Sequence, residues 1–163
     1  MNGAESIVKS LTAAGIDRCF ANPGTSEMHF LAALDRVGGI DCSLCLFEGV
    51  VTGAADGYAR MAGKPALTLL HCGPGLANGL ANLHNAKRAR TPMLNIVGDH
   101  ARDHVRFNTP LTSDVVDIAR PFSDWVRKID RPEDIARDVS EAIAASSGPK
   151  GGIATLVLPT DLA

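Results

Sequence analysis

Segments with a helical spacing of apolar residues alternate along this chain with short apolar runs, and this alternation constrains the fold more than any other feature. The runs expected to form strands are residues 17–21, 42–47, 66–70, 93–97, 125–129 and 153–158. Most segments between them have the apolar periodicity of helices. Strands that alternate with helices form parallel sheets with right-handed crossovers and helices on both faces. We therefore predict an α/β fold of three layers, α/β/α, around a six-stranded, mainly parallel sheet.

Length and composition limit what such a fold can do. The 163 residues fit one domain, and the hydrophobic share of 45% with an aromatic share of only 4% indicates an aliphatic core. A formal net charge of −2 argues against a nucleic acid or an anionic membrane as partner. There is no apolar run of about 20 residues and no signal-peptide pattern, so we expect a cytoplasmic protein with a small-molecule partner.

The four cysteines are expected to be reduced and mostly buried, because a chain of this size folds without disulfides. They are Cys19, Cys42, Cys45 and Cys72. Cys42 and Cys45 have the spacing of a zinc-binding pair, but no second pair follows. Residues three apart on a strand also point to opposite faces. No metal site is therefore predicted within this chain.

Three turns that follow expected strands are the candidate binding positions, because ligands of open parallel sheets bind beyond the carboxyl ends of the strands. They are Pro23-Gly24-Thr25, Phe47-Glu48-Gly49 and His71-Cys72-Gly73-Pro74-Gly75. A long polar connection, residues 98–121 with a short helix around 115–119, is a candidate functional loop.

Glu48 is the most unusual residue locally, because a carboxylate follows a run of apolar residues at the end of an expected buried strand. It could be a first-turn acid stabilised by the helix dipole, or a desolvated carboxylate that shares a proton with a ligand nitrogen. The following helix has Gly49, Gly53 and Gly57 along one face. That stripe indicates the close approach of a second helix or a partner subunit, or tight packing on the sheet.

Several of these motifs together resemble a known domain. Asn22-Pro23-Gly24-Thr25, Glu48, Asp56-Gly57-Tyr58-Ala59-Arg60 and Gly73-Pro74-Gly75 occur in this order. The combination is similar to the pyrimidine-binding (PYR) domain of thiamine-diphosphate-dependent enzymes, both acetolactate synthase-like and benzoylformate decarboxylase-like. The resemblance covers about residues 4–161. It implies the thiamine-diphosphate-binding fold of PYR type as a single domain, residues 1–163, without the family's central and diphosphate-binding domains.

The resemblance also implies roles for individual residues. Glu48 matches the glutamate that hydrogen-bonds N1′ of the aminopyrimidine and so promotes formation of the cofactor's ylid. His71 matches a catalytic histidine near the substrate, and Thr25 a residue that contacts the substrate carboxylate. The positions that match the cofactor site or its rim are Pro23, Gly24, Gly73 and Asn78. Without the resemblance, His71 could cap its strand, and the others could serve ordinary turns.

The function that the resemblance implies is decarboxylation or carboligation of small 2-oxo acids by a lyase or transferase that uses thiamine diphosphate. The diphosphate and Mg²⁺ are expected to be held by a diphosphate-binding domain of the same or a partner chain, in a homodimer or dimer of dimers. This chain alone is then expected to be inactive. Family members commonly have a glutamine after the glycine that follows the fourth strand, whereas this chain has Gly98-Asp99-His100 there. The alternatives are a non-catalytic or regulatory interaction subunit and a flavodoxin-like nucleotide-binding module.

Overall fold

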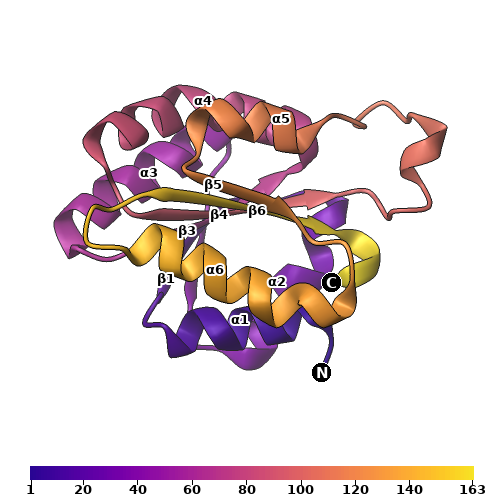
Figure 1. The fold of residues 1–163 in the computed structure, drawn as a ribbon, viewed down its shortest axis with the longest axis horizontal. Coiled ribbons are helices and arrows are strands. Elements are labelled where there is room, and N and C mark those ends of the chain that lie inside the picture. The colour runs from indigo at the N-terminus through magenta and orange to yellow at the C-terminus, as the bar shows by residue number, and fades with distance from the viewer.

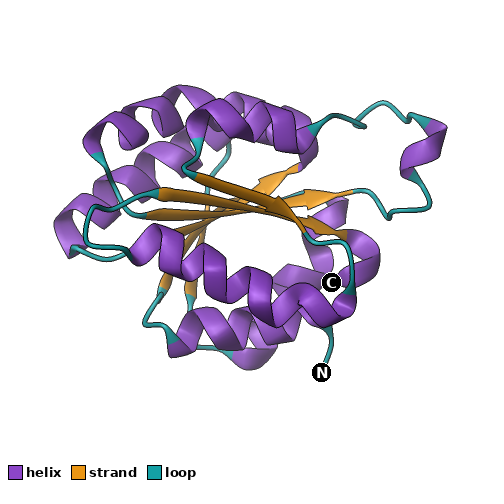
Figure 2. Ribbon diagram, viewed as in Figure 1, coloured by secondary structure: helices purple, strands orange, loops and turns teal.

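The computed structural model describes residues 1–163 as one six-stranded sheet between two layers of helices (Figures 1 and 2). The strands are β1 (Arg18–Asn22), β2 (Asp41–Leu44), β3 (Ala66–His71), β4 (Met93–Asp99), β5 (Trp125–Lys128) and β6 (Ile153–Pro159). They lie in the order β2-β1-β3-β4-β6-β5, and every neighbouring pair is parallel. The predicted α/β fold with six strands is confirmed.

Helices cover both faces of the sheet. They are α1 (Gly3–Ala13), α2 (Met28–Val37), α3 (Glu48–Ala62), α4 (Cys72–Ala89), α5 (Val115–Ala119) and α6 (Ile135–Ser147). Short 3₁₀ helices are η1 (Thr25–Glu27), η2 (Val105–Phe107), η3 (Arg120–Phe122), η4 (Pro132–Asp134) and η5 (Thr160–Leu162). In Figure 1, α1, α2 and α6 lie below the sheet, and α3, α4 and α5 lie above it.

The core follows from the central position of β3, β4 and β6. All residues of β4 and β6 are buried, because both strands have a neighbour on each side and a helix layer on each face. Aliphatic side chains form one apolar cluster under each helix layer, as the low aromatic content predicts. No helix is both long and apolar enough to cross a membrane.

The expected buried strand at residues 42–47 is wrong in both extent and burial. β2 ends at Leu44 and is an edge strand that pairs only with β1. Leu44 is exposed, and the following Leu46 is 90% exposed. Cys42 is exposed and Cys45 half-buried, so only Cys19 and Cys72 are buried as expected. The apolar run is therefore a surface feature of this chain rather than part of its core.

The candidate residues come together because β1, β2 and β3 are parallel neighbours, so their carboxyl ends lie at the same end of the sheet. The expected turn at residues 71–75 is shorter than predicted, since α4 begins directly at Cys72. The 98–121 connection contains η2 and the predicted short helix, α5. Part of this connection extends away from the carboxyl ends of the strands, at the right of Figure 1.

Candidate functional site

Glu48 is the first residue of α3, and it is both a first-turn acid and a buried carboxylate. It lies in the first turn of the helix and is only 8% exposed. Its Oε2 accepts a hydrogen bond of 3.0 Å from Asn78 Nδ2 of α4, whereas Oε1 makes no hydrogen bond within the chain. A Cβ atom on Gly75 would lie 3.1 Å from Oε1. One carboxylate oxygen is thus fixed, and the other lies beside a surface that glycine keeps flat.

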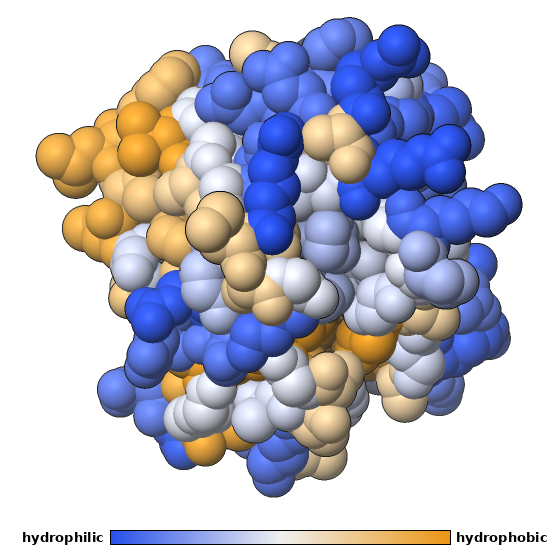
Figure 3. Space-filling model, turned by 90° about the vertical axis from the view of Figure 1, so that its left-hand side faces the viewer, coloured by the Kyte–Doolittle hydropathy of each residue, from blue (hydrophilic) through white to orange (hydrophobic).

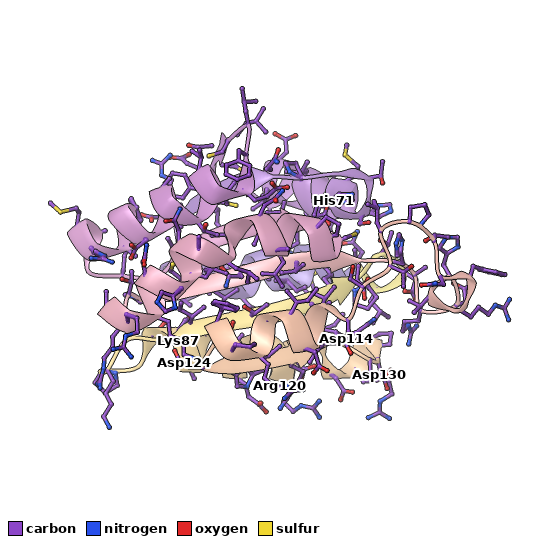
Figure 4. All side chains as sticks on the ribbon, turned by 90° about the horizontal axis from the view of Figure 1, so that it is seen from above. His71, Lys87, Asp114, Arg120, Asp124 and Asp130 are labelled. Atoms are coloured by element: carbon purple, nitrogen blue, oxygen red, sulfur yellow. The ribbon has the colours of Figure 1, made fainter.

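His71, the last residue of β3, is held by a carboxylate rather than by backbone capping. Its Nδ1 lies 2.8 Å from Glu27 Oε2, and its side chain is 22% exposed. No hydrogen bond is made by its Nε2 within the chain. In the view of Figure 4, His71 lies on the side of the molecule from which the long connection extends. The imidazole is therefore fixed on one nitrogen and unpaired on the other.

Glu27 is the residue that sequence reasoning missed. It lies in η1 and is 1% exposed; its Oε2 also accepts a hydrogen bond of 2.7 Å from the Gly24 N–H. Burial raises the pKa of Glu27 above its usual value, although Gly24 and His71 act in the opposite direction. Oε1 is buried without a hydrogen-bond partner. The signal for it was the spacing Gly24-x-x-Glu27, in which the third residue after an N-cap accepts the cap's N–H.

Pro23, Gly24 and Thr25 form the turn between β1 and η1. A Cβ on Gly24 would lie 2.5 Å from ring atoms of His71, so the close approach of the imidazole requires glycine there. Gly24 is also the N-cap of η1, so Thr25 is the first residue of that helix. Thr25 is exposed, and it lies with His100 and His104 at a shallow groove of about 380 Å³.

Gly73 differs from the other predicted cofactor positions because another segment covers it. It is buried in the first turn of α4, and a Cβ on it would lie 2.3 Å from Ser113 of the 98–121 connection. Glu48 and His71, by contrast, both border Gly75, from which a Cβ would lie 3.1 Å from Glu48 Oε1 and 3.4 Å from His71 Cβ. The site therefore consists of two adjoining groups, Glu48 with Asn78, and His71 with Glu27.

Glu27, His71 and Cys72 are the only three residues whose ligand atoms cluster as in a metal site, within 4.8 Å of one another. Hydrogen bonding accounts for this cluster, since Glu27 binds His71 and Ser26 Oγ lies 3.4 Å from Cys72 Sγ. Burial raises the pKa of Cys72 to about 11, which disfavours the thiolate that a metal needs.

The small-residue stripe on α3 serves partly to bring α4 close. Thr52 Oγ1 donates a hydrogen bond of 3.0 Å to the Gly79 carbonyl, and a Cβ on Gly79 would lie 2.8 Å from Thr52. Gly53 similarly faces Asn82 of α4. A Cβ on Gly57 would meet nothing within 4 Å, so its side of α3 is open. The second helix expected from the stripe is α4.

Comparison with known proteins decides the family. The model of the family "Thiamine pyrophosphate enzyme, N-terminal TPP binding domain" matches residues 1–119. The chain belongs to this family. A similar Mycobacterium tuberculosis protein, named "Putative acetolactate synthase large subunit IlvX", is 58% identical over 163 residues, which are 99% of this chain and 31% of that protein. Benzoylformate decarboxylase of Pseudomonas aeruginosa is 32% identical over 148 residues, 90% of this chain and 28% of that enzyme.

Solved structures of thiamine diphosphate-dependent enzymes have the same fold. The 4-hydroxybenzoylformate decarboxylase of Rhodococcus jostii superposes with a TM-score of 0.92 at 27% identity, over 99% of this chain and 30% of that enzyme. The resemblance to the pyrimidine-binding domain is thereby confirmed, and a flavodoxin-like module is not the family of this chain. The chain spans about 30% of the length of these relatives.

Proposed function

We propose that this domain binds the pyrimidine end of thiamine diphosphate, in an enzyme that decarboxylates or ligates 2-oxo acids. The observation that carries the proposal is the Glu48 carboxylate, which is buried and fixed by Asn78 on one oxygen only. Its free oxygen suits a ring nitrogen with which it can share a proton. The names of the relatives, acetolactate synthase and benzoylformate decarboxylase, support a 2-oxo acid as substrate.

The residues present fit this cofactor. Gly75 leaves space beside Glu48 Oε1 that a Cβ would fill. Pro23 and Gly24 follow β1 and lie at the same carboxyl end of the sheet. Glu48 would hold a proton at the pyrimidine nitrogen, and Asn78 would keep its carboxylate in place. When bound, thiamine diphosphate supplies the electron sink that stabilises the negative charge left by loss of carbon dioxide.

His71 and Thr25 are proposed to act on the substrate side. Because Glu27 occupies Nδ1 of His71, the unpaired Nε2 is the atom available for proton transfer. The exposed Thr25 hydroxyl is a candidate donor to the substrate carboxylate. Gly24 precedes Thr25 directly and lies against the His71 ring, so it links the two side chains. Gly73 is proposed to act indirectly, by letting residues 98–121 close over α4.

The remaining contacts of the cofactor are proposed to come from a diphosphate-binding domain of the same or a partner chain, which would hold the diphosphate and Mg²⁺. An exposed apolar face beside Glu48 supports such a partner: Leu46, Phe47 and Val50 are all exposed. A shallow cavity of about 680 Å³ adjoins them between α3 and α4. Figure 3 shows hydrophobic side chains gathered at one side of the molecule. This face is proposed to lie within a homodimer or dimer of dimers.

The test is Glu48→Gln in an assembly that contains this chain and a diphosphate-binding domain. Glutamine keeps the size of the side chain but cannot hold the proton in the same way, so we expect release of carbon dioxide from a 2-oxo acid to fall by about 10²-fold or more. Glu133→Gln, which changes an exposed glutamate in η4, is the matched control and should retain activity. Full activity of Glu48→Gln would refute the proposed role.

The isolated 163-residue chain should not turn over a 2-oxo acid. Enzyme-like turnover by it would contradict the proposal that a diphosphate-binding domain completes the site. A non-catalytic interaction subunit is the alternative. In that case Glu48→Ala should leave the affinity of the assembly for thiamine diphosphate unchanged, whereas the proposed function requires weaker binding. Calorimetric titration of both assemblies with thiamine diphosphate and Mg²⁺ distinguishes the two.

A further inference from the structure

Cys19 and Cys42 are the one pair of thiols that the fold places side by side, and the cofactor site does not use them. They are register partners on the neighbouring parallel strands β1 and β2. Register partners in a parallel pair point to the same face, on strands about 4.8 Å apart. This spacing falls within the Cα separation of about 4.4–6.8 Å that a disulfide needs. Each thiol also shifts the pKa of the other, as expected for two neighbouring side chains.

The two thiols differ in exposure and in acidity. Cys42 is exposed on the edge strand, and Cys19 is buried beneath it. Interaction with the Cys19 thiol lowers the pKa of Cys42 to about 7, whereas burial raises the pKa of Cys45 and of Cys72. Only a thiolate attacks peroxides readily, and solvent must reach it. Cys42 therefore has the properties of the attacking thiol, and Cys19 is placed to resolve the product.

We propose that Cys19 and Cys42 form a peroxide-reactive dithiol that closes to a disulfide between β1 and β2. In the first step the Cys42 thiolate attacks hydrogen peroxide, the O–O bond breaks, and a sulfenic acid and hydroxide form. In the second step the Cys19 sulfur attacks the Cys42 sulfur, the S–O bond breaks, and water leaves with the Cys19 proton. The two thiols lose two electrons in total, and the peroxide gains them.

The bond would lie directly upstream of both parts of the candidate site. β1 leads into Pro23-Gly24, and β2 leads through three residues to Glu48. β2 has no other strand neighbour, so β1 is the element that fixes it in the sheet. The disulfide would attach this edge strand covalently at its second residue, Cys42. The inference does not depend on the proposed cofactor, because each step involves only the two thiols and peroxide.

The test is mass spectrometry of the native chain after treatment with hydrogen peroxide and alkylation of the remaining thiols. Trypsin separates Cys19, in residues 19–36, from Cys42, in residues 37–60. We expect these two peptides to be linked, with a loss of two hydrogens. Because Cys45 shares the second peptide, Cys45→Ser is the matched control and should keep the link. Cys42→Ser, a change at an exposed position, should abolish it.

Two further measurements test the individual steps. In Cys19→Ser, dimedone should trap a sulfenic acid at Cys42, because the resolving thiol is gone. Iodoacetamide at pH 7 should alkylate Cys42 about tenfold faster than Cys45, because a lower pKa gives more thiolate, although each thiolate is then less nucleophilic. A link that survives Cys42→Ser, no dimedone adduct at Cys42, or a disulfide formed between two chains would overturn the proposal.

Discussion

Replacing Gly98 by alanine should destabilise the domain, although glycine-to-alanine changes at positions that accept alanine usually stabilise by about 0.4–1 kcal/mol. Gly98 lies in β4 and pairs with His71 of β3 and Leu158 of β6, so its backbone has no room to shift. A Cβ there would lie 1.7 Å from Glu27 Oε1 and 2.6 Å from Glu27 Cδ. The Glu27 side chain must therefore leave its place.

The magnitude follows from what Glu27 would lose. Its carboxylate makes two hydrogen bonds, with the Gly24 N–H and with His71 Nδ1. Hydrogen bonds to charged groups contribute about 1.5–3 kcal/mol each, and the displaced carboxylate regains part of this from water. We expect the free energy of unfolding to fall by about 2–4 kcal/mol. Urea unfolding followed by the fluorescence of Trp125, the only tryptophan, measures this change.

Two controls separate this contact from a general effect of alanine. Gly57→Ala in α3, where a Cβ would meet nothing within 4 Å, should stabilise by roughly 0.5–1 kcal/mol. In a Glu27→Ala background, Gly98→Ala should cost little, because the clashing carboxylate is absent. Equal stability of Gly98→Ala and wild type would refute the reasoning, and a full cost that persists without Glu27 would place the strain in the strand.

Three further predictions concern the same site and the exposed face. Burial raises the pKa of Glu27, so the folded chain binds the carboxyl proton more tightly than the unfolded chain. The free energy of unfolding should therefore fall as pH rises above about 4.5. Glu27→Gln should reduce this fall, as measured by urea titrations at several pH values. Asn78→Ala should lower activity of the assembly about tenfold with little change in the unfolding midpoint, because Asn78 is exposed and its amide holds Glu48. Leu46→Asp should weaken association, measured by sedimentation, and leave the circular dichroism spectrum unchanged.

The fold could be predicted from the sequence because alternation is a local property of the chain. Each strand and helix carries its own periodicity, and the rules for parallel sheets then leave few arrangements. The position of Glu48 at the start of a helix could be predicted for the same reason. Its fixation by Asn78 could not, because the two residues are 30 positions apart and meet only when α3 packs on α4.

The wrong burial of residues 42–47 and the missed Glu27 have a common cause: the polarity of a segment does not show which other segments pack against it. The run at residues 42–47 is apolar, yet β2 lies at an edge and Leu46 is exposed. Glu27 was missed for the converse reason: its turn looks polar and exposed, but the fold buries it against His71, 44 residues later in the chain. Both depend on tertiary neighbours that no local pattern specifies.

The exposed edge at β2 determines how this domain should behave when it is handled on its own. Leu44 is the exposed last residue of β2, a strand whose outer N–H and C=O groups have no strand partner, and Leu46 is exposed in the segment that follows. Such an edge is a template for adding a strand from another molecule, and Asp41, the first residue of β2, is the only charged side chain on the strand to oppose this. Aggregation of the separate domain should therefore start at β2, and Leu44→Lys should delay it.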